Sequence, residues 1–313
     1  MDGEERIFRG VMALGRLIDQ RHLGGLDGVN VCVQGRPPVE HHWTPDVRRD
    51  VFSVSKTLVS VAVGIAEAEG LLSPSDLLLR HLDHLAPTAA EGAESITVEQ
   101  LLTMTSGIVY RWNGSDTDGA DDPAQAIVAA ALGFEPGTGF AYRGGSTYLL
   151  SRVIHSCSGQ DVRDFLQTRV FTPLVIENPS WQRCPLGFSL GAVGLSLRTQ
   201  EVARIGQMLF DGGRWGDGQI VPAHYVVSLI SNPVDTDGHQ ATNAGGPHPE
   251  NARYGRHVWL CARDDAWRMD GIYGQFCVML PRQQAHVAVT GHYRGPTTDI
   301  LDAIWSEVVP AIQ

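Results

Sequence analysis

The sequence predicts an α/β (α+β) fold in which both ends of the chain build one sheet around a long helical insertion. Runs with the alternating apolar pattern of strands lie at residues 28–43 and again within residues 257–290. Between residues 70 and about 180, apolar residues recur mainly with helical spacing. We therefore expect residues 1–57 and 182–313 to form a sheet domain and residues 58–181 to form a mainly helical domain.

The first seventy residues are expected to give two helices and two strands. Residues 4–21 place apolar side chains on one side and are followed by a Gly-Gly pair, which predicts an amphipathic helix. Alternation predicts strands at Gly28–Val33 and Val39–Trp43, joined through the turn Arg36-Pro37-Pro38. The apolar run Val54–Gly70 has helical spacing and stops at a glycine, as expected of a second helix.

The remaining elements follow from caps, periodicity and turn residues. Thr97 and Gln100 form a capping-box pattern that starts a helix. Further helices are expected at about Asp122–Leu132, Thr147–Cys157, Asp161–Val170, Thr199–Phe210, Pro222–Ile230 and Asp299–Val308. Strands are expected at His257–Ala262, Tyr273–Leu280 and His286–Thr290, with a further short one at Trp267–Asp270, after a polar excursion at Pro233–Asn251.

Composition argues against several classes of protein. The 313 residues carry 24 Lys and Arg against 35 Asp and Glu, a net charge of −11 without any basic stretch, which disfavours a nucleic-acid or anionic-membrane partner. No apolar run approaches the ~18 residues of a membrane span, and the N-terminus lacks the pattern of a signal peptide. Five scattered cysteines without a Cys-x-x-Cys pair are typical of buried thiols in a reducing compartment. We expect a cytoplasmic protein that acts on a small molecule without a cofactor.

The strongest chemical signal is a serine three residues before a lysine at the start of the apolar helix. Three residues of helix turn through roughly 300°, so Ser53 and Lys56 stand on one face, about 5–6 Å apart at Cβ. A serine needs a base to take its proton, and a partly buried lysine whose pKa falls from ~10.4 to ~7–8 can be that base. Ser-x-x-Lys at a helix start is the nucleophile motif of serine β-lactamases and penicillin-binding proteins. A serine N-cap followed by an ordinary exposed lysine would show the same letters.

Two other serines compete with Ser53 for the role of nucleophile. Ser55 is next to Lys56, but adjacent helix residues point apart. Ser189 lies in a Gly-x-Ser-x-Gly pattern like the elbow of α/β-hydrolases, which needs a buried strand before it and a helix after it. Pro185 interrupts the segment before Ser189, and no early βαβ pattern exists, so Ser53 is preferred.

The twelve histidines and one acidic loop do not predict a metal site. His41 and His42 lie on one predicted strand and point to opposite faces, and His81 and His84 have no third ligand nearby in the sequence. The loop Asp116–Asp122 is similar to a calcium loop only superficially, because the twelfth position is not acidic. We expect no metal, and a solvated loop.

Five segments, each weak alone, occur in an order that points to one enzyme family. They are Phe52–Leu71, Leu101–Gly107, Glu135–Tyr142, Gly194–Thr199 and Asp270–Gln275. Over roughly residues 28–310 the chain resembles the class C β-lactamase / penicillin-binding-protein-like serine hydrolases, which include family VIII carboxylesterases and 6-aminohexanoate-dimer hydrolases. This resemblance implies a β-lactamase/transpeptidase-like fold: an antiparallel sheet flanked by terminal helices, plus an all-α domain, with the site in the cleft between them.

The resemblance also implies roles for particular residues. Ser53 would be the nucleophile, Lys56 its base and Tyr142 the tyrosine of the Tyr-x-Asn motif. The third motif, Lys-Thr-Gly or His-x-Gly on an edge strand, maps onto Ile272-Tyr273-Gly274, where glycine lets the strand approach the substrate. The backbone amides of Ser53 and Gln275 would form the oxyanion hole. By the same resemblance, the pocket lining would include Tyr110, Trp112 and the acidic loop Asp116–Asp122.

Two positions depart from the family pattern. Gly144 replaces the asparagine of Tyr-x-Asn, so the side-chain hydrogen bonds to lysine and substrate are missing, unless Arg143 or a water substitutes. Ile272 replaces the cation of the third motif, which removes the group that holds the carboxylate of a β-lactam or peptide. Gly144, Ile272, Tyr273 and Gly274 are nevertheless expected to contact the substrate.

The predicted function is therefore a serine hydrolase that cleaves an ester or amide of a small molecule through a Ser53 acyl-enzyme. An esterase or amidase is preferred over a β-lactamase because of Ile272. An acyltransferase on the same fold, passing the acyl group to an acceptor other than water, stays open. So does a non-catalytic, penicillin-binding-protein-like ligand-binding protein, which the missing asparagine favours and the intact Ser53, Lys56 and Tyr142 oppose.

Overall fold

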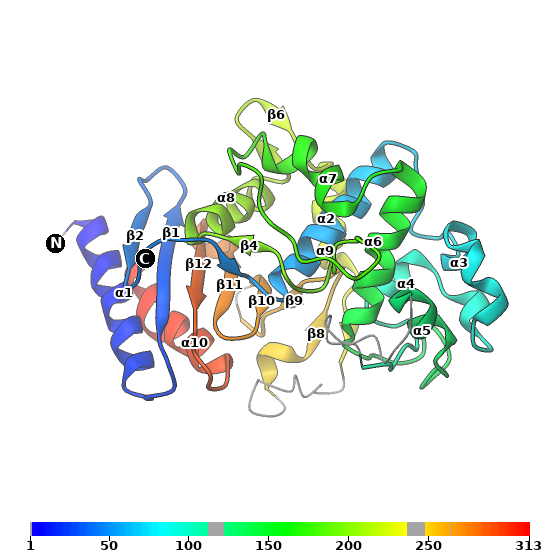
Figure 1. The fold of residues 1–313 in the computed structure, drawn as a ribbon. Helices are drawn as coiled ribbons and strands as arrows, with labels where there is room; N and C mark the ends of the chain where they lie inside the picture. The colour runs from blue at the N-terminus through cyan, green and yellow to red at the C-terminus, as the bar shows by residue number, and fades with distance from the viewer. Residues whose placement is uncertain (1, 112–121, 237–247, 264) are drawn as a thin grey trace.

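An eight-stranded antiparallel sheet is the frame of the molecule (Figure 1). The computed structural model describes residues 2–111, 122–236, 248–263 and 265–313. The strands of the sheet stand in the order β2-β1-β12-β11-β10-β9-β8-β7, and every neighbouring pair is antiparallel. Their bounds are β1 Leu26–Val33, β2 Val39–His42, β7 Val234–Asp235, β8 Arg253–Tyr254, β9 Trp259–Leu260, β10 Trp267–Gly271, β11 Gln275–Leu280 and β12 Ala285–Gly291. Two smaller pairs lie apart from it: β3 Arg49–Asp50 with β4 Ser196–Leu197, and β5 Arg214–Trp215 with β6 Gly218–Gln219.

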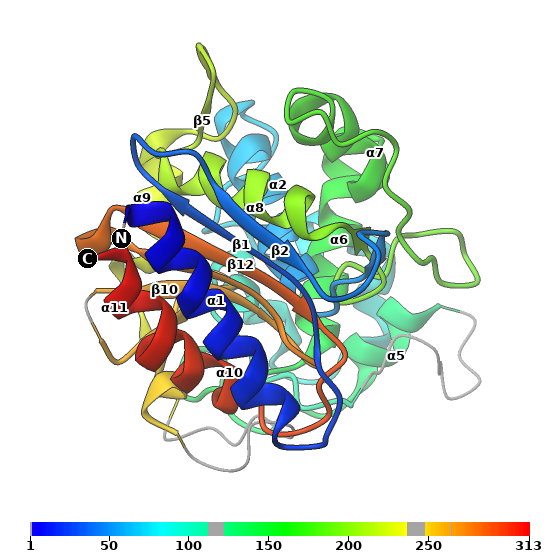
Figure 2. The ribbon, with the colours of Figure 1, turned by 90° about the vertical axis from the view of Figure 1, so that its left-hand side faces the viewer.

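Helices from both chain ends cover one face of the sheet. Helix α1 (Gly3–Asp19) lies beside α10 (Thr298–Ala303) and α11 (Val309–Ile312), which a π-helical turn at Ile304–Val308 joins (Figure 2). Their apolar sides close a core over β1, β11 and β12, with Val11, Val29 and Ile304 completely buried. Helix α8 (Thr199–Phe210) covers the opposite face.

The remaining helices gather beyond one edge of the sheet (Figure 1). They are α2 Val54–Ala68, α3 Leu78–His81, α4 Val98–Leu102, α5 Pro123–Ala129, α6 Gly144–Ser158, α7 Val162–Leu166 and α9 Ala223–Ser231. Short 3₁₀ or π turns complete the chain at Asp83–Thr88, Ala93–Ser95, Gln167–Phe171, Pro249–Asn251 and Pro281–Gln283. An antiparallel sheet with terminal helices and an added helical part is the predicted fold class, which is thereby confirmed. None of the described helices is long and apolar enough to cross a membrane.

Several predicted elements stand where the sequence placed them. Helix α8 has the predicted bounds, and the capping box at Thr97 and Gln100 makes both of its hydrogen bonds. The strand predicted at Tyr273–Leu280 begins only at Gln275, because Tyr273 has a left-handed backbone, with φ of +65°, and belongs to the turn. The strand predicted at His257–Ala262 is shortened to Trp259–Leu260 for the same reason, since φ of His257 is +60°.

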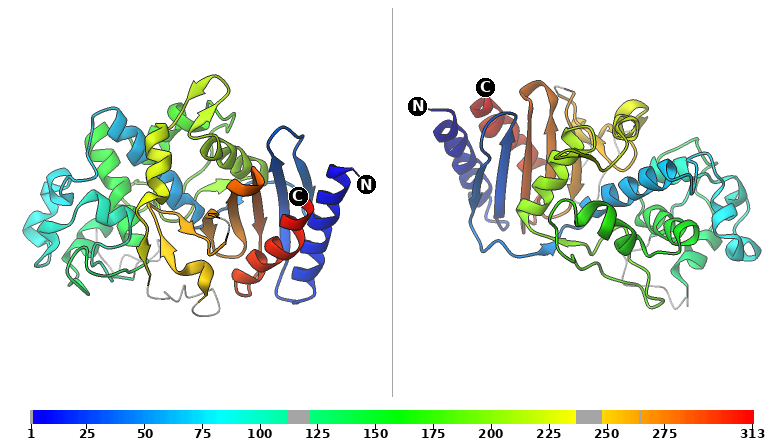
Figure 3. Two further views of the ribbon diagram at one scale, coloured as in Figure 1. Left: turned by 180° about the vertical axis from the view of Figure 1, so that it is seen from behind. Right: turned by 90° about the horizontal axis from the view of Figure 1, so that it is seen from above.

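Helix α2 is the buried axis between the sheet and the helical part (Figure 3). Every residue from Val54 to Ala66 is buried, and the helix contacts α6, α7 and β10. At Gly64 the helix passes so close to Tyr225 of α9 that an added Cβ would lie 2.3 Å from the tyrosine ring. The Ser60 hydroxyl and the Tyr225 hydroxyl lie 3.1 Å apart at the same crossing. Glycine therefore sets the distance between the two helices.

Replacing this glycine tests the close crossing. Gly64→Ala should lower the free energy of unfolding by about 1–3 kcal/mol, because overpacking outweighs the roughly 1 kcal/mol that alanine adds as a better helix former. Urea denaturation monitored by circular dichroism measures the change. In a Tyr225→Ala background the same substitution should be neutral or stabilising, because the obstructing ring is gone. An equal loss in both backgrounds would show that the ring is not what Gly64 accommodates.

Candidate active site

The backbone before α2 is shaped to present Ser53. Strand β3 leads into Val51, whose amide donates to Leu195 O at 2.8 Å. Phe52 then takes a left-handed conformation, with φ of +47°, while its amide donates to Asp50 Oδ1 at 2.7 Å. Positive φ is uncommon for a bulky residue and is often found at functional sites. The resulting turn places Ser53 at the N-cap position of α2 without a side-chain capping bond, so its hydroxyl is left for other partners.

Lys56 is the closest partner of the Ser53 hydroxyl. The lysine Nζ lies 2.7 Å from Ser53 Oγ and 2.9 Å from Ala192 O. Burial lowers the pKa of Lys56 to about 7, although the carboxylates of Asp270 and Asp50 act in the opposite direction. Desolvation penalises the charged form of an amine, and the two acids only partly compensate. A substantial fraction of Lys56 is therefore neutral near pH 7 and able to accept a proton.

Tyr142 completes the group around Ser53. Lys56 Nζ lies 5.1 Å from the centre of the Tyr142 ring, and the tyrosine hydroxyl shares hydrogen bonds with Ser53 and Trp259. The ring packs against the rings of Tyr254 and Trp259 at centroid distances of 5.7 and 5.4 Å. Burial raises the pKa of Tyr142 above its usual value, so this phenol stays protonated at neutral pH. The structure thus brings together the three residues predicted as the catalytic set.

The glycine that comes closest to Ser53 is not the one predicted from the sequence. It is Gly271, three residues before the predicted Gly274. A Cβ on Gly271 would lie 2.6 Å from Val51 O and 3.2 Å from Ser53 N, so strand β10 touches the nucleophile segment at Gly271. Gly274, the glycine predicted for that approach, lies instead beside Ile300 and Gly291. Tyr273 is partly exposed in the turn, and its ring packs edge-on against Phe52 at 5.1 Å.

This placement changes which backbone amide is nearest to Ser53. Ile272 directly follows Gly271 and lies outside the strand. In the described part of the chain, neither the Ser53 amide nor the Ile272 amide donates to another backbone carbonyl. Gln275, predicted to supply the second amide, pairs with Gly271 across the β10–β11 turn, and its side chain donates to Gly291 O at 2.6 Å. The geometry therefore favours Ile272 N–H over Gln275 N–H as the companion of the Ser53 amide.

Three groups near Lys56 were not identified from the sequence. Asp50 accepts the amides of Phe52 and Gly194, and Asp270 pairs with the fully buried guanidinium of Arg268 at 2.8 Å. Burial raises the pKa of both acids. His257 is buried, its pKa is lowered to about 3, and its Nε2 lies 3.1 Å from Thr147 Oγ1. No short motif marks Asp270 or His257, because they reach the site from distant segments, and Asp50 lies just before the Ser-x-x-Lys motif without being part of it.

The other predicted site residues have simpler positions. Gly144 is the first residue of α6, and Tyr110 is half-buried against the larger core. Trp112 and the acidic positions 116–121 lie outside the described residues, whereas Asp122 caps α5 and pairs with Arg152 at 2.7 Å. Ser189 donates to Asp161 at 2.6 Å, is completely buried and forms an isolated β-bridge with Arg183, without the strand and helix of an elbow.

A cavity of about 420 Å³ borders this site. Its lining includes Asp50, Phe52, Tyr273, Arg49, His292 and Arg294, but not Ser53, Lys56 or Tyr142. A small-molecule substrate needs a concave site of this size, with a few polar groups to orient it. The cavity beside Asp50 and Phe52 is therefore a candidate for an outer part of a substrate site, next to the turn that leads into Ser53.

This fold, with a serine in contact with a buried lysine at a helix start, is that of the β-lactamase/transpeptidase-like class of proteins. A model of the Beta-lactamase family matches residues 14–306, and the chain belongs to that family. It is 26% identical to the 6-aminohexanoate-dimer hydrolase of Paenarthrobacter ureafaciens in an alignment of 279 residues that covers 82% of this chain and 69% of the relative. The predicted family resemblance is confirmed.

Solved structures share the fold at low sequence identity. A D-stereospecific amidohydrolase from Streptomyces sp. superimposes with a TM-score of 0.71 at 17% identity, over 94% of this chain and 98% of that one. EstCE1, described as a hydrolase with promiscuous acyltransferase activity, gives a TM-score of 0.76 at 15% identity, over 97% and 99% of the two chains. At these identities the superpositions show a shared fold.

The pKa of Lys56 sets an expected pH dependence. If neutral Lys56 takes the serine proton, kcat/KM should rise with pH and level off above an apparent pKa of about 7. Asp50→Asn removes a carboxylate that raises the pKa of Lys56 but keeps an oxygen acceptor, so the profile should move to lower pH. Initial rates on a neutral ester between pH 5 and pH 9 measure both profiles, after correction for spontaneous hydrolysis.

The matched control removes the same charge from a remote place. Asp217 lies exposed in the turn between β5 and β6, and Asp217→Asn should leave the profile unchanged. A rate that falls as pH rises through 7, or an Asp50→Asn profile displaced to higher pH, would contradict a neutral lysine as the base.

Proposed function

We propose that the protein is a serine hydrolase that cleaves an ester or amide of a small molecule through an acyl-enzyme on Ser53. The observation that carries this proposal is the 2.7 Å contact between Lys56 Nζ and Ser53 Oγ, made by a lysine whose pKa burial lowers to about 7. A serine hydroxyl becomes an effective nucleophile when a base in hydrogen-bond reach removes its proton. Both conditions, reach and basicity, are met by one residue.

The reaction follows from the three side chains in order. Neutral Lys56 accepts the Ser53 proton as Oγ bonds to the substrate carbonyl carbon, and the carbonyl π electrons move to the oxygen. When the tetrahedral intermediate collapses, the bond to the leaving group breaks, and neutral Tyr142 donates the proton that the leaving group needs. The lysine ammonium then returns its proton to Tyr142. In the second half a water molecule attacks the acyl carbon through the same groups, releasing the acid and restoring Ser53.

The oxyanion of the intermediate needs fixed donors. We assign them to the backbone amides of Ser53 and Ile272, in place of the Gln275 amide suggested by the sequence. The close approach of Gly271 to Ser53 N supports this choice, because Ile272 is the next residue in the chain. Removing one such donor typically lowers turnover 10²- to 10³-fold, so the hole is a major part of catalysis.

The charges around the site favour substrates without a carboxylate. If Gly271 is the motif glycine, the position of the family's cation falls on Met269; if Gly274 is, it falls on Ile272. Both residues are apolar. The nearby guanidinium of Arg268 is completely buried and already bonded to Asp270, to Glu250 O and to Asn251, which leaves it no reach to a substrate. Asp270 adds negative charge near Lys56. Neutral esters and amides fit this environment best.

We place the enzyme in the cytoplasm. All five cysteines are unpaired, and three of them, Cys184, Cys261 and Cys277, are buried. Secreted proteins usually oxidise their cysteines to disulfides, whereas a reducing cytoplasm keeps them as thiols. Detection of the protein in a fractionated native host tests this placement.

The first test of function asks which serine is acylated. Ser53→Ala should abolish covalent labelling by p-nitrophenyl acetate and reduce ester turnover by several orders of magnitude, because the nucleophile itself is lost. Intact-protein mass spectrometry detects the acyl adduct, and peptide mapping locates it. Added alcohol in the same assay shows whether the acyl group passes to water or to another acceptor, which separates a hydrolase from an acyltransferase.

Two serine variants are the controls for this labelling. Ser55 donates to Phe52 O, and Ser189 donates to Asp161, so both hydroxyls are occupied elsewhere. Ser55→Ala and Ser189→Ala should keep the acyl adduct. An adduct that survives in Ser53→Ala and disappears in Ser189→Ala would overturn the proposal.

The second test compares esters with β-lactams. Short-chain p-nitrophenyl esters should be hydrolysed far faster than nitrocefin, because a missing charge-assisted hydrogen bond to the β-lactam carboxylate is worth about 1.5–3 kcal/mol, or roughly 10- to 150-fold. Equal efficiency on nitrocefin and on the best ester in the unmodified enzyme would refute the expected preference.

A further inference from the structure

Three metal-binding side chains converge far from the chemistry of Ser53. Glu40 and His42 stand on β2, and Asp46 follows in the loop toward β3. One ligand atom of each lies within 4.8 Å of the other two, and all three residues are half-buried, so an ion can reach them from solvent. Within the described ranges this is the only group of three or more His, Cys, Asp or Glu residues with such spacing. We propose that Glu40, His42 and Asp46 bind a divalent zinc ion.

The strand geometry explains why two of the ligands share one face. Residues two apart in a strand point to the same side, so Glu40 and His42 face one way and His41 faces the other. The His41 ring packs between Phe8 and Trp43, at centroid distances of 5.7 and 4.7 Å. Gly28 stands opposite His42 on β1, and a Cβ there would lie 2.5 Å from His42 Nδ1. Only glycine leaves room for the imidazole in this position.

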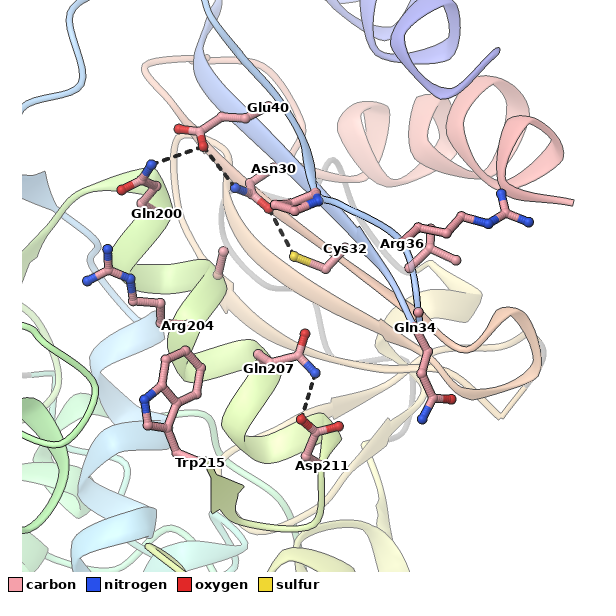
Figure 4. A pocket seen from close by; sticks show the side chains of 14 residues that line it. Asn30, Cys32, Gln34, Arg36, Glu40, Gln200, Arg204, Gln207, Asp211 and Trp215 are labelled. Carbon is pink, nitrogen blue, oxygen red and sulfur yellow. Dashed lines mark hydrogen bonds between the residues drawn. The ribbon is translucent and has the colours of Figure 1, made fainter. Parts of the chain in front are cut away.

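Neighbouring elements orient the two carboxylates, and Figure 4 shows the partners of Glu40. One oxygen of Glu40, Oε2, accepts from Asn30 Nδ2 at 3.2 Å and from Gln200 Nε2 at 3.1 Å. The other oxygen, Oε1, is thereby left to face His42 Nε2, with which it shares a hydrogen bond. Asp46 Oδ1 accepts from the Thr199 amide at the start of α8, at 3.3 Å. Partners of this kind fix first ligands in metal sites.

The donor set suits zinc better than a hard cation. Zinc is bound by imidazole nitrogen and carboxylate oxygen at about 2.0–2.2 Å, often by three protein ligands and one water. Calcium prefers six to eight oxygen ligands, and magnesium keeps several waters in an octahedral shell. Ligand atoms of a tetrahedral zinc site are about 3.4 Å apart, so side-chain rotations of an ångström or so would close the present triad. The two carboxylates would balance the ion's charge, and the ion would take the place of the proton shared by Glu40 and His42.

An ion here would tie β2 to the segment that carries the nucleophile. Asp46 precedes β3 and the Phe52 turn, while Glu40 is held by β1 and α8. Glu40 also stands at the edge of a cavity of about 460 Å³ between β1, β2 and α8, which gives solvent a path to the site (Figure 4). The expected role is structural, with the ion joining the sheet edge to the start of α8.

Zinc affinity measures the proposed site directly. Chelator-treated protein should take up one equivalent of Zn²⁺ in competition with a chromophoric chelator. His42→Gln should weaken this binding by more than about 100-fold, and Gln200→Ala, which removes only a partner of Glu40, by about 10-fold. His41→Gln is the matched control, since it changes the adjacent histidine on the opposite face and should leave the affinity unchanged. All variants keep the five cysteines, so any zinc held by thiols is common to them.

A second measurement needs no ligand variant. In protein labelled with ¹⁵N-histidine, one equivalent of Zn²⁺ should shift one imidazole signal, and the same shift should appear in His41→Gln. Uptake that is equal in the unmodified protein and His42→Gln, equal losses in His41→Gln and His42→Gln, or the absence of any imidazole shift would each overturn the site. Neither measurement reports on ester turnover, so the result is independent of the proposed function.

Discussion

The burial of one lysine is the constraint on which the site depends. A pKa lowered from 10.5 to about 7 corresponds to roughly 5 kcal/mol of lost preference for the charged form of Lys56. The folded chain binds the proton more weakly than the unfolded chain, so this burial destabilises the fold most below pH 7 and least above pH 10. The same loss leaves a fraction of the amine neutral near pH 7, which the proposed role of Lys56 as the base requires. Residues Val54–Ala66 of helix α2 are buried, and α6, α7 and β10 contact the helix.

Two residues with a left-handed backbone and one glycine allow the sheet to approach the start of helix α2 closely. Phe52 and Tyr273 both have positive φ and pack against each other at 5.1 Å, one on each side of the approach. Between the two segments, Gly271 lies where any side chain would strike Val51 O. Backbone strain of this kind costs about 1–3 kcal/mol for each residue and persists only where the surroundings enforce it. The resulting close approach of Gly271 to Ser53 N is what the proposed pair of oxyanion donors requires.

The candidate site could be predicted from the sequence in those segments where residue types suited to catalysis occur in a recognisable local pattern. Ser53 and Lys56 are one helical turn apart, so their contact follows from helix geometry alone, and the bounds of α8 followed from periodicity. The third motif was assigned to Gly274 because glycine and a following strand were visible, but the close approach is made by Gly271. A left-handed tyrosine in a turn leaves no mark in the sequence. Asp270 and His257 were missed because they come within reach of Lys56 only after more than 200 intervening residues have folded.

Asp270 and Arg268 on strand β10 bear on two properties at once: the stability of the fold and the charge that a substrate would meet near Lys56. Successive residues of a strand point to opposite faces, whereas positions 268 and 270 share one, so the buried guanidinium reaches Asp270 at 2.8 Å. A buried arginine is tolerable only when its donors are satisfied, and Asp270, Glu250 O and Asn251 satisfy them. The cation of this strand is thus paired within the fold, and its partner acid remains within electrostatic reach of Lys56. A substrate carboxylate near this strand would meet an acid without a free cation from the same strand, which supports the proposed preference for neutral substrates.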